Sequence, residues 1–179
     1  MQWKMKIVYN PTRHMKLNVV LIEPEIPQNT GNIGRTCAAA GASLHLVKPF
    51  GFSVEDKYLR RAGLDYWQFL DVHYYENKAE FFSSHNNKDC VFFSKKAVKN
   101  YCDITYTDNV YLIFGKETLG LPEELVQTNL SRAVRIPMIK GARSLNLATA
   151  VAVVVYEALR QNDFDGMALE GEFGVLWPQ

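Results

Sequence analysis

RIPMIKGARSLNLATAVAVVVYEALRQ, residues 135–161, is the stretch that decides the fold. Within it, residues 147–159 include only Thr149 and Glu157 as plainly polar side chains. The absence of glycine and proline over this length favours a helix, although the run Val153–Val155 leaves a buried strand as the alternative. A helix that is apolar nearly all round must be covered on more than one side. In a small chain one cover is a sheet and the other can be a second subunit, so a homodimer is expected.

The rest of the chain alternates short apolar runs with helical patterns. Such alternation is typical of an α/β fold with a mainly parallel sheet flanked by helices. Expected strands are Leu17–Ile22, Ser43–Val47, Cys90–Phe93, Tyr111–Phe114 and Ala133–Ile136. Expected helices are 32–40 (capped by Thr30 or Asn32 and stopped by Gly41), 54–61, 78–84, one opened by Pro122, and 146–161.

The chain reads as one domain with two flanking segments. The domain runs over residues 15–162, and residues 1–14 form an N-terminal extension of unknown role. The C-terminal tail, 163–179, is acidic and carries no basic residue. No repeat or linker interrupts the domain, so a single hydrophobic core is expected.

Composition excludes several protein classes. The chain of 179 residues is 47% hydrophobic and 22% charged, which is ordinary for a globular protein. It has no apolar run long enough for a membrane helix and no apparent secretory signal. Three cysteines without a CxxC pair indicate reduced thiols in a cytoplasmic protein.

Positive charge is local rather than global, because the net charge is only +1. Two basic clusters stand out: Arg132, Arg135, Lys140 and Arg143, and then Lys57, Arg60 and Arg61. Each cluster can be a solvated surface or part of a basic stripe for phosphates, and the sequence leaves both interpretations open.

The loop PEIPQNTGNIGR, residues 24–35, follows the first strand, where open α/β sheets bind ligands. Gly31 and Gly34 would let the backbone approach a ligand closely, although a plain strand-to-helix connection also explains them. A nicotinamide enzyme would need GxGxxG here and an acid at the end of the second strand, where Lys48 stands instead. The sequence therefore does not favour that class.

A second loop, FGKETLGLPEEL at 114–125, directly follows another apolar strand. Gly115 and Gly120 bracket Glu117, and a plain glycine turn would not explain why Lys116 and Glu117 are charged at the end of a strand. This loop is therefore a candidate for ligand binding.

The third loop, within residues 135–151, connects the last strand to the final helix. Pro137 and Gly141 predict an irregular path. Ser144 or Asn146 can cap the final helix, and capping is the favoured role for Ser144 when it is considered alone.

Other familiar chemistries find little support. The histidines lie apart and form no HExxH, so no metal site is expected; they are His14, His45, His73 and His85. The sequence also lacks GxSxG around Ser144 and lacks a P-loop, which argues against a serine hydrolase and a nucleoside-triphosphatase.

The three loops, in this order, resemble the three motifs of the SPOUT RNA methyltransferases. The resemblance is closest to the TrmL (YibK) type, the tRNA (cytidine/uridine-34)-2′-O-methyltransferases, and spans about residues 17–161. The stretches that carry it are PEIPQNTGNIGR (24–35), LRRAGLDYW (59–67), FGKETLGLP (114–122) and RIPMIKGARSLNLATAVAVVVYEALRQ (135–161).

The resemblance implies a fold, a cofactor and an assembly. The C-terminal part of the sheet would be threaded into a deep trefoil knot, and the enzyme would act as a homodimer. Its loops would hold S-adenosylmethionine, leave S-adenosylhomocysteine as product and need no metal. Contacts to the cofactor would fall on Ser94, Gly115, Glu117, Gly120, Ile136, Met138, Ser144 and Leu145.

The resemblance also implies a substrate, the anticodon stem-loop of tRNA, methylated at the ribose of the wobble nucleotide. Contacts to RNA would come from Asn29, Arg60, Arg61, Arg143 and Tyr156, with Arg135 as a further phosphate candidate and Trp67 or Tyr66 as stacking candidates. Packing in the core or at the dimer interface is the alternative role for Tyr156, and core packing is the alternative for Trp67 and Tyr66. Ribosomal RNA or another tRNA position, and a non-catalytic RNA-binding module, are the alternatives.

The catalytic residue implied by the first motif is Arg35, and the alternative is that Arg35 is only a surface residue of the first helix. A guanidinium stays protonated in nearly every protein site, so Arg35 is not expected to act as a free general base. We expect it to hold the hydroxyl and the adjacent phosphate, while the phosphate or water accepts the proton.

Overall fold

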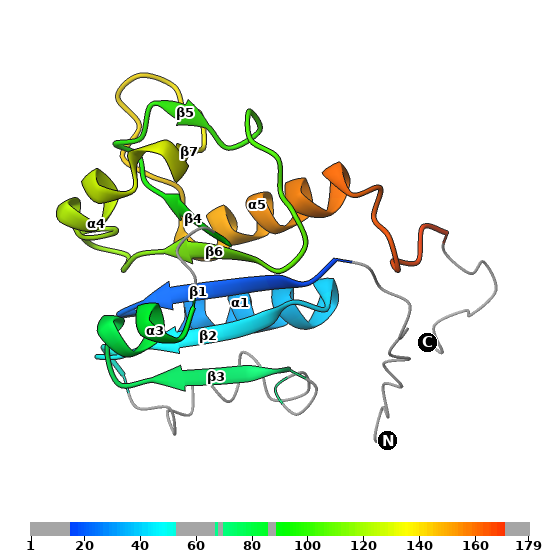
Figure 1. Cartoon of the computed structure of the whole chain (residues 1–179), viewed down its shortest axis with the longest axis horizontal. Helices are drawn as coiled ribbons and strands as arrows, with labels where there is room; N and C mark the ends of the chain where they lie inside the picture. Colours follow the sequence, from blue (N-terminus) through cyan, green and yellow to red (C-terminus); the bar gives the residue numbers. More distant parts are fainter. Residues whose placement is uncertain (1–14, 53–66, 68–69, 86–88, 171–179) are drawn as a thin grey trace, which may run out of the picture.

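The sheet is parallel throughout, as the alternation of elements predicts. The computed structural model describes residues 15–52, 67, 70–85 and 89–170 (Figure 1). The spatial order of the strands is β3-β2-β1-β6-β4-β7-β5, and every ladder is parallel. The strands are β1 (Leu17–Ile22), β2 (Ser43–Val47), β3 (Val72–Tyr75), β4 (Cys90–Phe93), β5 (Lys99–Asn100), β6 (Val110–Phe114) and β7 (Ala133–Arg135).

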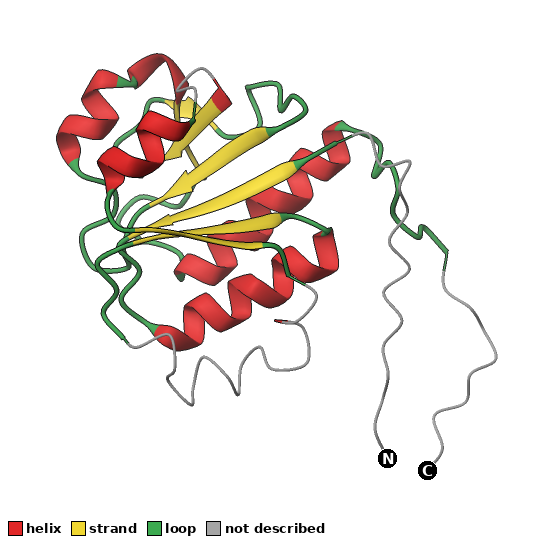
Figure 2. Ribbon diagram, turned by 60° about the horizontal axis from the view of Figure 1, so that its bottom comes forward, coloured by secondary structure: helices red, strands yellow, loops and turns green. Residues whose placement is uncertain are grey.

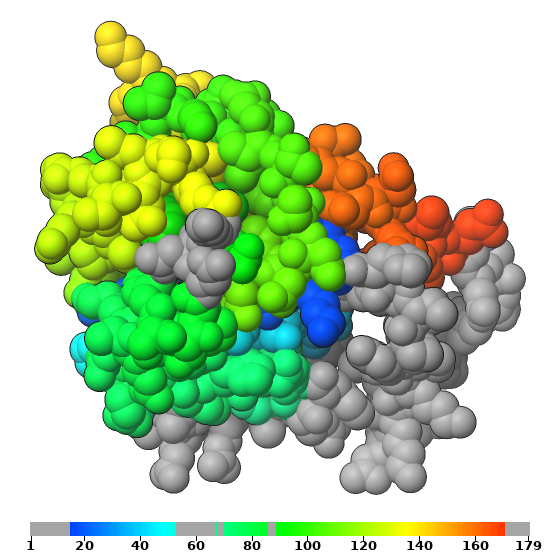
Figure 3. Space-filling view, viewed as in Figure 1, coloured from blue at the N-terminus to red at the C-terminus, as the bar shows by residue number. Residues whose placement is uncertain are grey.

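Helices cover both faces of the sheet, which makes three layers (Figure 2). The helices are α1 (Pro27–Ala40), α3 (Lys78–Ser84), α4 (Glu123–Thr128) and α5 (Leu147–Gln161), with a 3-10 turn at Leu130–Arg132. The long helices α1 and α5 pack against each other on one face. On the other face lie α3 and α4, which stand in front of the sheet in the space-filling view (Figure 3).

The central strand β1 shows why both faces need cover. All six of its residues are buried. Leu17, Val19 and Leu21 belong to the core cluster under α1 and α5, whereas Val20 and Ile22 belong to the cluster under α3 and α4. A strand with apolar side chains on both faces is stable only between two layers.

The strands β1 and β6 are neighbours in the middle of the sheet. The helix after β1 lies on one face, and the helix after β6 lies on the other. Chain connections therefore diverge at the carboxyl ends of these two strands. Open α/β sheets bind ligands at such a switch point.

Most predicted elements are confirmed within one residue, but the first helix is not. It begins at Pro27 rather than at residue 32, so Thr30 and Asn32 lie inside it and neither caps it. Gly41 does end the helix, with a left-handed φ of 62°. At the final helix Asn146 is the cap, so the capping role favoured for Ser144 was wrong.

Two short strands, β3 and β5, were not predicted, because neither shows the apolar run that marks a central strand. The helix expected at 54–61 lies outside the described residues. So do the extension 1–14 and the end of the tail, 171–179. Of the described tail, Phe164 and Met167 pack against the core. None of the helices in the described ranges has the length and apolarity needed to cross a bilayer.

Candidate active site

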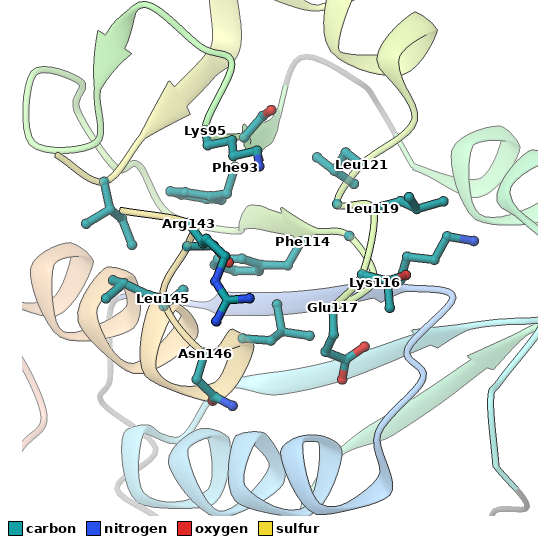
Figure 4. Close-up of a pocket in the computed structure, with 18 of the residues that line it drawn as sticks. Phe93, Lys95, Phe114, Lys116, Glu117, Leu119, Leu121, Arg143, Leu145 and Asn146 are labelled. Carbon is teal, nitrogen blue, oxygen red and sulfur yellow. The ribbon is translucent and has the colours of Figure 1, made fainter. Parts of the chain in front are cut away.

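A cavity of about 450 Å³ opens at the carboxyl ends of β1, β4, β6 and β7 (Figure 4). The structure brings to it every residue that the sequence assigned to the cofactor, which are Ser94, Gly115, Glu117, Gly120, Ile136, Met138, Ser144 and Leu145. These residues come from three loops that are distant in the chain. We call this cavity the cofactor pocket, because the resemblance assigns these residues to the cofactor.

The loop 115–121 forms one wall of the cofactor pocket and is folded tightly on itself. The Gly120 N–H donates to the Lys116 carbonyl oxygen at 2.9 Å. A Cβ atom on Gly115 would lie 2.2 Å from the Gly120 carbonyl carbon and from the Leu121 nitrogen. Only glycine fits at position 115, since the obstructing atoms are backbone.

The carboxylate of Glu117 holds the start of α1. It accepts hydrogen bonds from the backbone N–H groups of Glu25 (2.9 Å) and Ile26 (3.2 Å), and from the amide nitrogen of Asn29 (3.0 Å). Ile26, the residue that precedes α1, has no side chain able to cap it. Glu117 binds the N–H groups of the two residues that precede α1, and its negative charge suits the positive end of the helix dipole.

Neighbouring side chains strengthen this contact between two loops. Thr118 donates to the Glu25 carboxylate through its N–H (3.1 Å) and its hydroxyl. Lys116 donates to Glu23 at 2.9 Å. Hydrogen bonds from Lys78 and Lys116 hold the pKa of the Glu23 carboxyl below its usual value. Hydrogen bonds to charged groups of both loops therefore hold the 115–121 loop against the 23–26 loop.

Asn29 and Asn146 extend the network to the final helix. The Asn146 amide donates to the Asn29 side-chain oxygen at 2.9 Å. The Asn146 side-chain oxygen in turn accepts from the N–H groups of Ala148 and Thr149. One hydrogen-bonded path thus runs from Glu117 through Asn29 to the first turn of α5. Since Asn29 is buried and both ends of its amide bond protein groups, its geometry is that of a cross-link, and its contact with RNA stays a prediction.

Part of the cofactor pocket is apolar. The rings of Phe93 and Phe114, at the ends of β4 and β6, stack with centroids 4.5 Å apart and planes 11° apart. Leu121, Ile136 and Leu145 lie around them. This mixture of apolar surface and a few polar groups is typical of small-molecule sites.

The loop between β7 and α5 forms the opposite wall and is much more exposed. Every residue from Ile139 to Asn146 is exposed, and Ile139 keeps 85% of its surface accessible. Figure 4 shows Arg143 reaching over the cofactor pocket from this loop. A cation at this place can pair with an anionic group of a ligand.

Other predicted residues lie away from the cofactor pocket. Arg35 is exposed on α1 and does not line it, and Tyr156 is 45% exposed on α5. Arg135, half-buried at the end of β7, also lies outside the lining. Arg60, Arg61 and Tyr66 fall outside the described residues.

Trp67 has a packing contact that agrees with core packing, the alternative to its stacking role. A Cβ atom on Gly34 would lie 3.0 Å from its ring, so the indole rests directly on α1. The stacking role suggested for Trp67 therefore competes with a place against the core.

The lining also includes Phe93, Lys95 and Lys96, which lie outside the quoted motifs, and Phe114, which opens the second motif but was assigned no role. Both phenylalanines end parallel strands, and the two lysines follow β4 after Ser94. The rule that ligands bind at carboxyl ends could have found them. Among the described residues, no three histidine, cysteine or acidic side chains are grouped to hold a metal ion.

Comparison with known proteins places these features in a family. The model of the SpoU rRNA Methylase family matches residues 16–156. The tRNA (cytidine(34)-2′-O)-methyltransferase of Escherichia coli K12 is 45% identical over 154 residues, which cover 86% of this chain and 98% of that protein. A relative from Geobacillus stearothermophilus is 50% identical over 157 residues, which cover 86% of this chain and all of the relative.

Solved structures agree with this. The fold matches, with TM-score 0.78 and 42% identity, a structure reported for 2-OH methylation of C/U34 on tRNA; the match covers 84% of this chain and 98% of that one. It also matches the SpoU methyltransferase AviRb of Streptomyces viridochromogenes in complex with AdoMet, with TM-score 0.75 and 27% identity, over 86% of this chain and 60% of that one. With its sequence matched from residue 16 to residue 156, the chain belongs to the SpoU methylase family.

Proposed function

We propose that this protein transfers a methyl group from S-adenosylmethionine to the ribose 2′-hydroxyl of nucleotide 34, a cytidine or modified uridine, in tRNA anticodons. The observation that carries the proposal is the meeting of the three motif loops at one pocket. The relative from Escherichia coli, which matches over nearly its whole length, supports the reaction and the position.

The residues present suit the cofactor. A cavity of about 450 Å³ lies within the range of small-molecule sites. The stacked Phe93 and Phe114, with Leu121, offer apolar surface for an adenine ring. Lys95 and Arg143 are available to the cofactor's carboxylate. A structure of an AdoMet-bound relative with the same fold supports this assignment.

In this methyl transfer the protein itself has little covalent chemistry to perform. The bound cofactor supplies an electrophilic methyl group on a sulfonium. The chain must align the ribose oxygen with that group and exclude water, and the fixed 115–121 loop suits this task. Arg35 would hold the hydroxyl and the adjacent phosphate, and the phosphate or water would accept the proton.

We propose that the active form is a homodimer built on the face of α1 and α5. Arg35 and Tyr156 are both exposed on these two helices, which pack against each other. Ala152 and Val153 on α5 stay only half-buried, so this apolar surface could be covered by a second copy. Sedimentation should give twice the mass of the chain, and Tyr156→Asp should shift it toward the monomer.

The trefoil knot is also a proposal. After β7 the chain passes along the cofactor pocket through residues 137–146 and returns to α5, which packs on α1 near the start of the domain. This path is compatible with threading through the 115–121 loop. Slow refolding that is accelerated by a cut in residues 137–146 would support it.

A cytoplasmic location is part of the same proposal. The three cysteines, Cys37, Cys90 and Cys102, are free thiols. Free thiols suit a reducing compartment.

The decisive assay is transfer of tritium from labelled cofactor into tRNA and into isolated anticodon stem-loops. Arg35→Ala should reduce turnover at least 100-fold, an estimate of about 3 kcal/mol of lost transition-state stabilisation, while calorimetry shows an unchanged affinity for the cofactor. Arg35→Lys, which keeps the charge but loses the planar fork, should remain impaired. If neither RNA accepts methyl, the assignment to tRNA fails; if Arg35→Ala loses cofactor affinity equally, Arg35 supports the cofactor pocket instead.

A second candidate is methylation of ribosomal RNA, which the family's description favours. A nucleotide-resolved methylation map from cells lacking the protein separates the two, because only one RNA class should lose its 2′-O-methyl group. Cofactor binding without turnover on any RNA would instead indicate a non-catalytic RNA-binding module.

A further inference from the structure

A second cavity, of about 400 Å³, lies behind the 115–121 loop, toward α3 and α4. Its charged lining is Glu23, Lys78, Lys96, Lys116 and Glu123, and its floor is the turn 119–122. We call it the lysine cavity. The motifs that led to the cofactor pocket do not include Lys78 or Lys96.

The lysine cavity and the cofactor pocket adjoin each other. Lys96, Lys116 and residues 119–121 line both. Figure 4 shows the side chains of Lys116 and Glu117 pointing in different directions, with Glu117 directed toward the start of α1. Lys78 opens α3, which starts at the same edge of the sheet as α4 (Figure 1). A polymer that crosses this edge could therefore occupy both cavities at once.

Carboxylates position the three ammonium groups. Glu23, whose side chain is only 16% exposed, accepts one hydrogen bond from Lys78 and one from Lys116. Glu123 pairs with Lys96. An ammonium has three N–H groups, so one bond to a carboxylate leaves it able to donate to another anion. Among the lining residues, three lysines against two carboxylates leave one net positive charge, and the carboxylate of Glu25 also acts on Lys116 from outside the lining.

A purely structural ion-pair network is the competing interpretation. One lysine would be enough to neutralise the half-buried Glu23, yet two converge on it. A third, Lys96, arrives from the end of β4, and it keeps 57% of its side chain exposed, as Lys78 keeps 40%. Cations that converge from three elements and still face solvent indicate a site for an anion.

We infer that the lysine cavity binds a phosphate of the RNA backbone beside the nucleotide whose ribose is methylated. The inference rests on the proposed function, because it needs an RNA strand to enter from the cofactor pocket. Lysine binds phosphate as a point charge, and backbone phosphate contacts fix the register of a nucleic acid without reading its bases. Lys78, Lys96 and Lys116 are thus positioning residues, and they should act on binding of RNA.

The first test compares Lys78→Gln with Lys16→Gln, which removes an exposed lysine at the opposite, amino edge of the sheet. For an anticodon stem-loop, Lys78→Gln should raise Kd roughly threefold to tenfold at low salt and lower the slope of log K against log salt by about one. The loss should appear in KM for RNA rather than in kcat. Lys78→Arg should restore binding, and Lys16→Gln should match the wild type.

A variant that is expected to tighten RNA binding distinguishes the inference from a simple loss of folding. Glu123→Gln removes an exposed negative charge from the lysine cavity, so it should tighten RNA binding by roughly twofold to fivefold. A structural network would predict no gain in affinity from this change.

Stem-loops that carry one neutral methylphosphonate linkage at successive positions identify the source of the anion. One linkage near nucleotide 34 should weaken binding to the wild type and have no further effect on Lys78→Gln. Inorganic phosphate that stabilises the wild type but not Lys78→Gln, without coupling to any linkage, would mean a free-phosphate site and overturn the inference.

The outcomes separate this inference from the proposed function. If the wild type methylates the stem-loop and Lys78→Gln binds it as Lys16→Gln does, the lysine cavity is not a phosphate site and the methyltransferase assignment stands. If the wild type neither binds nor methylates any tRNA, the proposed function fails and this inference falls with it.

Discussion

Two loops face each other across the cofactor pocket, and they are held in opposite ways. The 115–121 loop is closed on itself, and Glu117 anchors it to the start of α1 through three hydrogen bonds. The 137–146 loop is almost wholly exposed, and its described anchor to another segment is the bond from Asn146 to Asn29. One wall is therefore fixed by folding, whereas the other leaves its side chains for ligands.

The difference indicates how such a site can combine a rigid pocket with a large substrate. Charge-assisted bonds to backbone N–H groups fix a wall without occupying the cavity. An exposed wall with Arg143 and Ile139 can adapt to a polymer that enters from solvent. Changes in the first wall should cost stability and cofactor binding together, and changes in the second should cost binding alone.

The largest effect is expected for Gly115→Val. Its side chain would meet backbone atoms at 2.2 Å, so the loop must open. Calorimetry should show at least about 100-fold weaker cofactor binding, the scale of a severe overpacking. The matched control is Gly120→Ala, where a Cβ meets nothing within 4 Å and only the φ of +72° is unfavourable, at about 1–2 kcal/mol. Normal cofactor affinity in Gly115→Val would show that this wall is not rigid.

The second-largest effect is expected for Glu117→Ala. Three donors lose a charged acceptor, so the free energy of unfolding in urea should fall by about 2–4 kcal/mol. Arg143→Ala, on the exposed wall, should change it by less than about 0.5 kcal/mol. Equal losses in the two variants would contradict the contrast between the walls.

Asn146→Ala should have a smaller effect on unfolding. It removes the cap of α5 and the hydrogen bond to Asn29, so the free energy of unfolding should fall by about 1–2 kcal/mol. Asn146→Asp keeps the cap and loses only the donor to Asn29, so it separates the two contributions. A double-mutant cycle of Asn146 with Asn29 should give a coupling of about 1 kcal/mol. Zero coupling would mean that the two walls are independent.

The smallest effect is expected from pH. The pKa of Glu23 is lowered in the folded state from an ordinary value of 4.5, chiefly by its hydrogen bond with Lys78. Its stabilisation is therefore complete above pH 4.5 and is lost as pH falls through the folded pKa. Urea midpoints between pH 7 and pH 3 should fall less steeply for Glu23→Gln than for the wild type. An identical pH dependence would exclude Glu23 as a charged anchor of the first wall.

Local patterns predicted the regular elements well and their ends less well. Five central strands and the final helix could be read from apolar runs, because burial on both faces is visible in the residues themselves. The start of α1 was misplaced, since no side chain caps it and the segment before it is held by the distant Glu117. The short strand β3, with an exposed His73 and Tyr74, lacks such a pattern.

In the candidate site too, the sequence predicted some features and only the structure revealed others. Motifs 114–122 and 135–146 named residues that do meet at one pocket. Neither motif could reveal that Asn29 is buried between Glu117 and Asn146, or that Lys78 turns toward Glu23. Arg35 was named by resemblance, and its exposed place on α1 agrees with the alternative that it is a surface residue of the first helix.

The sequence by itself determined the parallel α/β class and the edge of the sheet where ligands should bind. Both follow from the pattern of apolar residues within each segment and from the alternation of strands and helices along the chain. Only the tertiary structure decided which groups stand face to face there. Glu117 binds the segment that precedes a helix 90 residues earlier in the chain, and Lys78 shares a carboxylate with Lys116. Such contacts depend on how separate segments pack, and no short stretch of sequence encodes that packing.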